Sequence, residues 1–334
     1  MTQPRNRQID LSSTSFYHCM CRCVRQAFLC GFDAYSEKDY GHRRQWILER
    51  LQLLASLFAT DVCAYAVMSN HVHLVLRVDK ARAEAWDNFE LADRWKRLYG
   101  LPKHVAAALA GDASGADKAL ANEKLTKWRR RLYSVSWFMK CFSEVIARMA
   151  NEEDECTGRF WEGRFKSQPL LDERALLTCM AYVDLNPIRS KQAETPEGSD
   201  FTSVQERIRA WGDFREIERS LTEPTKEPWL LPFRDTEHET EDPVIPYQLM
   251  DYLQLVEQTG RVICTDKPGA IPSDLPPLLT RLGVDQEEYL AFVASDDRRL
   301  IHGAVGAIKA FAQSVGKKFF RNYRELGRLY QLRE

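Results

Sequence analysis

Hydrophobic and polar positions alternate near the start of the chain. In residues 16–24, the tyrosine and the cysteines fall on one side, and His18 falls on the other with a methionine and an arginine. This period of two predicts a β-strand. Two later runs, 62–68 and 70–76, are apolar and rich in β-branched residues, with a tight Ser69-Asn70 turn between them. They predict two more strands.

A helical period separates the first predicted strand from the other two. Apolar residues in 43–58 form one stripe, made of Trp46, Ile47, Leu51, Leu54 and Leu57. The order strand, helix, strand, strand suits an antiparallel sheet covered by helices on one face. We therefore expect an α+β fold.

The middle of the chain is helical in pattern. Residues 80–122 are less regular and contain a Gly/Ala/Ser/Asp loop at 110–116, so we interpret them as a helical insertion. Apolar residues then recur at helical spacing from 126 to 149, which predicts one long helix. Its start carries Arg129, Arg130 and Arg131. These cations form either a solvated face or a contact for DNA phosphates.

A segment at 158–167 mixes glycines, aromatic residues and cations. Its candidate contacts are Arg159, Trp161, Arg164, Phe165 and Lys166. Such a segment can clamp phosphates and stack bases, although a plain hydrophobic turn has a similar composition.

The next element is a predicted helix that begins after an N-cap. Asp172 precedes apolar residues that run to about Leu185, and Asn186-Pro187 ends the helix. Tyr182 and Asn186 are four residues apart, so they share one face.

After Pro187 the chain is more polar, and stretches with proline and glycine interrupt the helical pattern. We expect one more helix near 204–211, an acidic linker within 216–243, and short helices from Tyr247 to the C-terminus. This gives a domain at 1–215, a linker at 216–243, and a helical domain at 244–334 that could bind DNA through its basic end, 317–333. That end could equally be a solvated helix.

Composition narrows the class of protein. The chain has 334 residues with a net charge of −1, so affinity for nucleic acid must come from local basic patches. We find no apolar core of a signal peptide and no apolar run of the ~18 residues that a membrane span needs. Nine cysteines form no disulfide or zinc pattern. We expect buried thiols and a cytoplasmic location.

The 70–76 strand carries the candidate chemistry. His71 and His73 project from one face, roughly 7 Å apart along the strand. Paired imidazoles of this kind are satisfied structural residues at least as often as metal ligands. If the Asn186 oxygen joins them, they could hold a divalent cation that polarises a phosphate. Tyr182, one turn away, would then be a candidate nucleophile, because a nearby cation favours the phenolate.

Three segments together resemble a known family. Residues 68–74 (MSNHVHL), 158–167 (GRFWEGRFKS) and 182–189 (YVDLNPIR) are similar, in this order, to the motifs of REP-associated tyrosine transposases, a branch of the one-tyrosine HUH transposases. The similarity covers roughly residues 16–211.

The resemblance implies a ferredoxin-like antiparallel sheet with flanking helices, the HUH nuclease fold. It also implies a single-stranded DNA endonuclease and strand transferase that uses Mg²⁺ or Mn²⁺ and acts on palindromic hairpins in DNA transposition. By position, Tyr182 would be the nucleophile that forms a 5′-phosphotyrosine, and His71, His73 and Asn186 would be metal ligands.

The chain departs from the simplest family pattern in its insertion and its C-terminal domain. Asparagine at 186, where the insertion-sequence branch has glutamine, points to the REP-associated branch, so a monomer is as acceptable as a homodimer. Two imidazoles prefer Mn²⁺ or Zn²⁺ to Mg²⁺, so Mn²⁺ should bind at least as well as Mg²⁺.

Two other functions fit parts of the sequence. A domesticated protein that binds hairpin DNA and cuts it little or not at all would explain the added C-terminal domain, but the whole catalytic set is present. A His-x-His metallohydrolase of small molecules is the other candidate. Two observations count against it: the sequence shows no further acidic ligand motif, and the aromatic and cationic segment at 158–167 would have no role.

Hairpin binding should be localised and strongly dependent on salt, because the chain as a whole is almost neutral and the cations act locally. The measurement is the affinity for a DNA hairpin at low and at moderate salt. If the affinity barely changes, the basic residues of 129–131 and 158–167 do not contact DNA phosphates.

Overall fold

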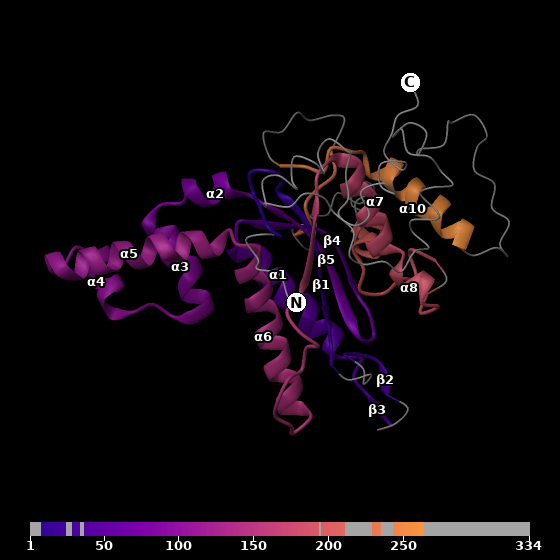
Figure 1. Cartoon of the computed structure of the whole chain (residues 1–334), viewed down its shortest axis with the longest axis horizontal. Helices are drawn as coiled ribbons and strands as arrows, with labels where there is room; N and C mark the ends of the chain where they lie inside the picture. Colours follow the sequence, from indigo (N-terminus) through magenta and orange to yellow (C-terminus); the bar gives the residue numbers. More distant parts are fainter. Residues whose placement is uncertain are drawn as a thin grey trace, which may run out of the picture. The chain divides into compact units, whose positions relative to one another are not determined.

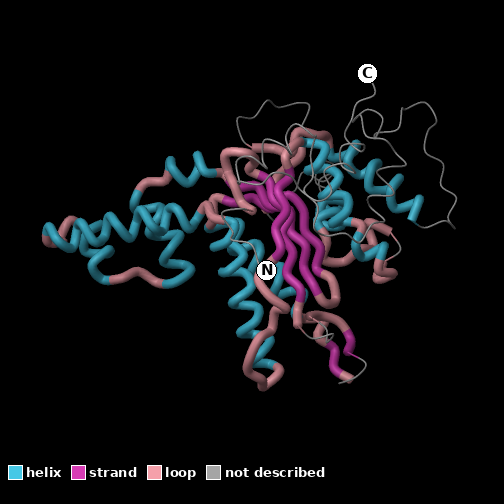
Figure 2. Tube along the Cα trace, in the orientation of Figure 1, coloured by secondary structure: helices cyan, strands magenta, loops and turns pink. Residues whose placement is uncertain are grey.

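A computed structural model describes residues 8–24, 29–33, 37–193, 195–210, 229–234 and 243–263. The chain forms two compact units. The first takes in the described residues of Met1–Arg44, Val62–Leu76 and Phe160–Glu334, and the second is made of Gln45–Asp61 and Arg77–Arg159. The first unit holds most of a β-sheet, and the second is largely helical (Figures 1 and 2).

The main sheet has the strand order β4-β5-β1-β6. Its strands are β1 (Phe16–Arg22), β4 (Thr60–Val67), β5 (His71–Val78) and β6 (Lys166–Leu170). The expected antiparallel sheet is confirmed. A helix lies in sequence between β1 and β4, and others between β5 and β6, which is the β-α-β-β-α-β order of a ferredoxin-like sheet. A separate two-stranded sheet pairs β2 (Phe32–Asp33) with β3 (Lys38–Asp39).

The edge strand β6 fixes the register of β1. The two strands are antiparallel, with His18 opposite Gln168 and Phe16 opposite Leu170. Because β1 is also the neighbour of β5, side chains from three strands meet on one face of the sheet.

The helix α7 (Glu173–Asp184) covers that face of the sheet. It begins as expected, with the Asp172 carboxylate accepting a hydrogen bond from the Ala175 N–H at 2.8 Å. From Ala175 to Asp184 every residue is buried except Tyr182. A helix that is buried all round must be covered on both sides. On the sheet side its core partners include Ala66, Val75 and Leu170.

The helix α10 (Leu249–Ile263) covers the other side of α7. Its Tyr252, Leu255 and Val256 are buried in the same core cluster as α7. At Gly260 an added Cβ would lie 3.3 Å from Leu185 Cδ2, so glycine allows close packing there. A short helix, α8 (Asn186–Arg189), follows α7 directly, and Figure 1 shows α7 and α10 side by side.

One buried carboxylate joins these elements. Asp184 is fully buried and accepts hydrogen bonds from the Ser203 hydroxyl at 2.5 Å, the Val204 N–H at 3.0 Å and the Tyr252 hydroxyl at 2.5 Å. The Ser203 hydroxyl in turn accepts from the Tyr65 N–H of β4 at 3.0 Å. Asp184 therefore fixes α7 to β4, to α10 and to the start of the helix at 203–210.

The second unit contains the predicted helical insertion. Its helices are α1 (Arg43–Leu57, of which Arg43 and Arg44 belong to the first unit), α2 (Lys80–Ala85), α3 (Asn88–Tyr99), α4 (Lys103–Ala110), α5 (Gly115–Leu132) and α6 (Val135–Glu153). The expectation of one long helix over 126–149 is wrong. The helix breaks at Tyr133-Ser134, where the Ser134 hydroxyl accepts from the Trp137 N–H and starts α6. An N-capping side chain competes with helix continuation, which the apolar stripe does not reveal.

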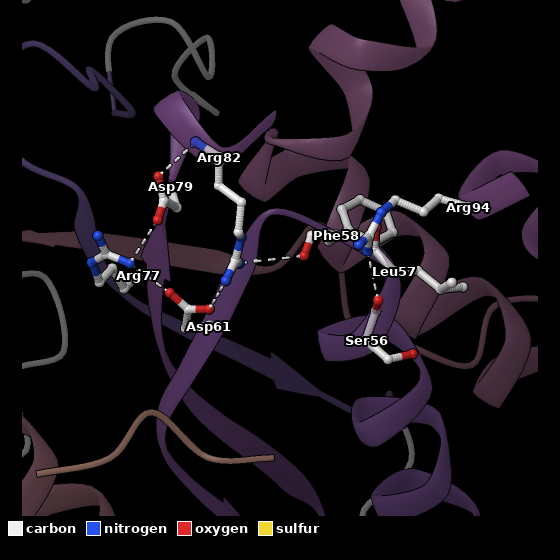
Figure 3. A network of polar contacts seen from close by, with 8 residues as sticks. All are labelled: Ser56, Leu57, Phe58, Asp61, Arg77, Asp79, Arg82 and Arg94. Atoms are coloured by element: carbon white, nitrogen blue, oxygen red, sulfur yellow. Dashed lines mark hydrogen bonds and ion pairs between the residues drawn. The ribbon is translucent and has the colours of Figure 1, made fainter. Parts of the chain in front are cut away.

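A polar network ties the start of the insertion to the strand ends of the second unit (Figure 3). The Asp61 carboxylate bridges Arg77 and Arg82, each at 2.7 Å. Asp79 caps α2 by accepting from the Arg82 N–H at 3.0 Å. Burial raises the pKa of Asp79, but this N–H and the Arg77 charge outweigh it and hold the pKa below its usual value. Arg94 donates to the Ser56 carbonyl at 2.8 Å, which satisfies the end of α1.

The cysteines behave as buried thiols, as expected. Those described are free, and all but Cys156 are buried. Burial raises the pKa of Cys30 to about 11, so this thiol stays protonated at neutral pH. Among the described helices, none combines the length and the apolar content that a membrane span requires.

Parts of the predicted C-terminal region lie outside the described residues. Of the predicted linker, the structure describes 229–234 and Pro243, and Leu230 forms a parallel bridge with Val62 of β4. Of the predicted C-terminal domain it describes 244–263, where α10 packs on α7. The helices predicted after residue 263, and the basic end at 317–333, are not among the described residues.

Replacing Asp184 by alanine should destabilise the protein by about 3–5 kcal/mol at neutral pH, because three donors and the nearby buried Arg207 lose their anionic partner. Urea unfolding measures this change. The control is Glu173→Gln at the exposed start of the same helix, which should shift the free energy of unfolding by well under that amount.

The same carboxylate gives a pH dependence. Burial raises the pKa of Asp184 to about 6, from 3.8. The folded state thus binds this proton more tightly than the unfolded state. The contribution of the protonated Asp184 to the free energy of unfolding is therefore complete below pH 3.8 and is lost as pH rises to about 6. Asp184→Asn should remove that slope from unfolding measured across this range. If the free energy of unfolding of this variant still falls with the same slope, Asp184 is not the group that titrates in this range.

Candidate active site

Three imidazoles converge on the face of the sheet that α7 covers. His71 and His73 come from β5, as alternation along a strand requires, and their ring centroids are 4.7 Å apart. His18 comes from the neighbouring strand β1 and stacks on His73 with centroids 5.1 Å apart. The imidazoles are buried, His73 most completely with 1% of its surface exposed.

A chain of hydrogen bonds orients these rings. An amide oxygen can only accept, so the contact of 2.7 Å between Gln168 Oε1 and His18 Nδ1 places the proton on that nitrogen. In the neutral ring His18 Nε2 is then an acceptor. It receives a hydrogen bond from His73 Nδ1–H at 2.9 Å. With both rings neutral, this order of donors makes His73 the tautomer whose Nε2 carries the lone pair.

His71 is oriented in the same way by its neighbour in sequence. Its Nδ1 lies 2.5 Å from the Asn70 side-chain oxygen, which can only accept, so in the neutral ring Nε2 carries the lone pair. Neutral imidazoles with the second nitrogen tied to an acceptor are the usual form of histidine ligands of metals. The chemistry of these donors thus fits a divalent cation.

Tyr182 of α7 lies against this cluster. Its ring meets His73 edge-on with centroids 5.7 Å apart, and His18 with centroids 6.2 Å apart. It is the one residue of the buried part of α7 that keeps some exposure. The Arg189 guanidinium lies 5.2 Å from the ring centroid. The Tyr182 ring thus has two imidazoles and a cation among its neighbours.

Asn186 lies at the junction of α7 and α8. Its side-chain NH₂ donates to the Tyr182 carbonyl at 2.8 Å, which satisfies the end of α7. Its amide oxygen is of a type that divalent cations accept as a ligand. Within the described residues, no group of three or more His, Cys, Asp or Glu side chains is arranged to hold a metal, so a site here would depend on two imidazoles and this amide.

The predicted DNA contacts lie in both units. In the second unit, Arg129 donates to the Ala83 and Trp86 carbonyls at 2.5 and 2.7 Å and so holds α2. Arg131 lies 3.8 Å from the Trp137 ring centroid. Arg130 and Arg159 are exposed.

The remaining predicted contacts lie in the first unit, in the segment that leads into β6 and at the first residue of that strand. The segment runs along the end of β1, with an antiparallel bridge between Cys23 and Trp161. Trp161 is buried and meets Phe160 edge-on. Phe165 is half-buried, and Arg164 and Lys166 are exposed, as phosphate contacts must be.

Sequence reasoning missed His18, Gln168 and Asp184. The alternation of β1 had placed His18 opposite the cysteines, but this says nothing about the neighbouring strand. Gln168 is 150 residues from His18 in sequence. The available signal was one polar residue, His18 or Gln168, on the core-facing side of each strand. This signal indicates a contact only once it is known that the two strands are neighbours in the sheet.

Comparisons with known proteins add little to this geometry. No family model matches the chain, and no curated protein does. The chain is similar to a solved structure described as a REP-associated tyrosine transposase bound to a REP hairpin, with 11% identity, coverage of 72% of this chain and 100% of that chain, and a TM-score of 0.36. At this score the similarity carries no argument, so the candidate site stands on its own contacts.

The hydrogen-bond chain predicts the tautomer of His73. Long-range ¹H–¹⁵N NMR of the histidine rings should show His73 protonated at Nδ1 when it is neutral. Gln168→Leu removes the acceptor that orients His18 and should lower this population, whereas Gln168→Glu keeps an acceptor oxygen and should preserve it. A His73 ring protonated at Nε2 in the unmodified protein would contradict the chain of donors.

Proposed function

We propose that this protein is a metal-dependent endonuclease and strand transferase for single-stranded DNA, acting on palindromic hairpins through a covalent 5′-phosphotyrosine. It would serve DNA transposition of REP-like elements. The observation that carries the proposal is the contact of the Tyr182 ring with His73, at 5.7 Å between centroids, beside the His71 and His73 pair. The motif resemblance found in the sequence supports the same assignment.

His71 and His73 would hold a Mg²⁺ or Mn²⁺ ion through their Nε2 atoms, with the Asn186 amide oxygen as third ligand. The ion would act as a Lewis acid that polarises and orients the scissile phosphate. Because two of these ligands are imidazoles, the site should bind Mn²⁺ at least as tightly as Mg²⁺. His18 and Gln168 would act as positioning residues, because they fix the ring of His73.

Tyr182 would carry the covalent step. Its phenolic oxygen attacks the scissile phosphorus, and the bond between phosphorus and the 3′ oxygen breaks. The departing strand keeps the electron pair and takes a proton from water to become a free 3′-hydroxyl, while the phenolic proton goes to solvent. One phosphate ester bond replaces another, so attack by a 3′-hydroxyl can reverse the step and rejoin strands.

Exposed cations would position the DNA. Arg164 and Lys166 at the start of β6, with Arg159, would contact phosphates, and the half-buried Phe165 would stack on a base. The burial of Trp161 favours a role in shaping this segment, and its stacking on a base remains a prediction.

A hairpin-binding protein that does not cut is the second candidate. The observation that favours it is the near-complete burial of His73, in edge contact with the Tyr182 ring, because a phosphate must reach His73 for cleavage. A labelled hairpin separates the two candidates.

Incubation of the protein with a labelled single-stranded hairpin and Mn²⁺ should give a covalent adduct that survives denaturing electrophoresis. Tyr182→Phe should abolish the adduct, because it removes the nucleophilic oxygen and keeps the ring. His71→Ala should reduce it by at least 100-fold, since a ligand is lost.

Tyr40→Phe is the matched control, because it removes a phenol from the same unit outside the imidazole cluster and should leave the adduct unchanged. Tight hairpin binding with no adduct in the unmodified protein would support the second candidate. An adduct that persists in Tyr182→Phe would move the nucleophile to another residue.

A further inference from the structure

A basic pocket in the second unit has no part in the chemistry described above. It has a volume of about 660 Å³, within the usual range for pockets that enclose a small molecule. One face of the last turns of α5 lines it, together with the start of α6. Its lining includes Thr126, Lys127, Arg130, Arg131, Ser134 and Trp137.

Helical spacing explains why these residues are available. Leu125, Trp128 and Leu132 are buried on one face of α5, so the residues of the opposite face are left outside. Lys127 and Arg130 are exposed. Over the described part of the chain, no ion pair involves Lys127, Arg130 or Arg131, although Glu123 also lines the pocket.

Arg131 is held in place by aromatic rings. Its guanidinium carbon is 3.8 Å from the Trp137 ring centroid and 5.6 Å from that of Trp95. Trp95 is itself stacked on Trp128 with centroids 4.9 Å apart. A cation held in this way loses little conformational entropy when it binds a ligand.

The start of α6 adds favourable polarity. Ser134 is its N-cap, and the first N–H groups of a 19-residue helix begin at the pocket. The Thr126 hydroxyl donates to the Asn122 carbonyl at 2.9 Å and so has no proton left for a ligand. The Ser134 hydroxyl accepts from the Trp137 N–H and keeps its own proton. Cations outside any ion pair, one hydroxyl donor and a helix N-terminus around one hollow are features that bind phosphate.

We propose that this pocket binds the phosphodiester backbone of a single DNA strand. Lys127 and Arg130 contact phosphates, and Arg131 with Trp137 supports an adjacent base. The assignment deepens the proposed function by adding a second contact for the substrate strand, and it excludes Arg129, whose guanidinium is used to hold α2.

A purely structural role makes a different prediction. Cations in the last turn of α5 also stabilise the C-terminal end of that helix, by typically 0.3–1 kcal/mol each. In that case their removal would lower the melting temperature and leave the affinity for DNA unchanged.

The test uses a fluorescein-labelled oligothymidine, the full chain carrying Tyr182→Phe, and a chelator. Neither cleavage nor a metal is then required, so failure here is distinct from failure of the proposed nuclease. Lys127→Glu with Arg130→Glu should weaken binding by on the order of 10-fold and reduce the salt slope by roughly 1–2, because two phosphate contacts are lost.

The matched control is Lys96→Glu with Arg97→Glu, two exposed cations of α3 that do not line the pocket. It makes the same change of net charge and should alter the affinity less than about threefold, as expected for exposed charges that contact no phosphate and are screened by salt. If both double variants weaken binding equally, or neither does, the pocket is not a DNA site. Lys127→Gln with Arg130→Gln replaces the glutamates if circular dichroism shows that those variants do not fold.

Competition with inorganic phosphate shows whether the pocket binds a DNA strand or a free phosphate ion. Millimolar phosphate should leave most of the oligothymidine bound, because several contacts act together along a strand. Complete displacement by millimolar phosphate would assign the pocket to a free phosphate and overturn the proposal.

Discussion

The register of α7 depends on one buried carboxylate. Asp184 accepts from Ser203, Val204 and Tyr252, and through Ser203 it connects to the edge strand β4. Tyr182 is two residues earlier, so it points to a different side of the helix. The interaction that fixes one side of α7 therefore decides what the other side presents to the imidazoles, and a rotation of the helix would move the phenol away from His73.

The imidazole cluster is ordered by hydrogen bonds that cross the sheet. Gln168, His18 and His73 come from three adjacent strands, and each orients the next by a hydrogen bond. The outermost residue of this chain is an amide whose oxygen only accepts, so with a neutral His18 ring the donors run from His73 to His18 to Gln168. In the proposed metal site, Gln168 and His18 would set the tautomer of His73 and so its readiness to bind a cation.

The second unit is held together by different means. Its strand ends and helix ends are joined by Asp61, Arg77 and Arg82, and carbonyls at helix ends are satisfied by Arg94 and Arg129. Several of its arginines thus have structural tasks, whereas Lys127 and Arg130 on the outer face of α5 do not. A run of basic residues in a sequence does not separate these two groups, because the difference lies in which carbonyls the fold brings near.

The sequence alone determined the local features of this protein. A period of two placed His71 and His73 on one face, Asp172 marked the start of α7, and a spacing of four placed Tyr182 one turn from Asn186. Only the tertiary structure decided that His18 and Gln168 stand beside them, that Asp184 anchors the helix, and that the predicted long helix breaks at Ser134. Alternation along a strand tells which face a side chain takes, but the neighbouring strand is chosen by pairing between distant segments. For that reason the pair of histidines could be found in the sequence and the chain of donors that orients them could not.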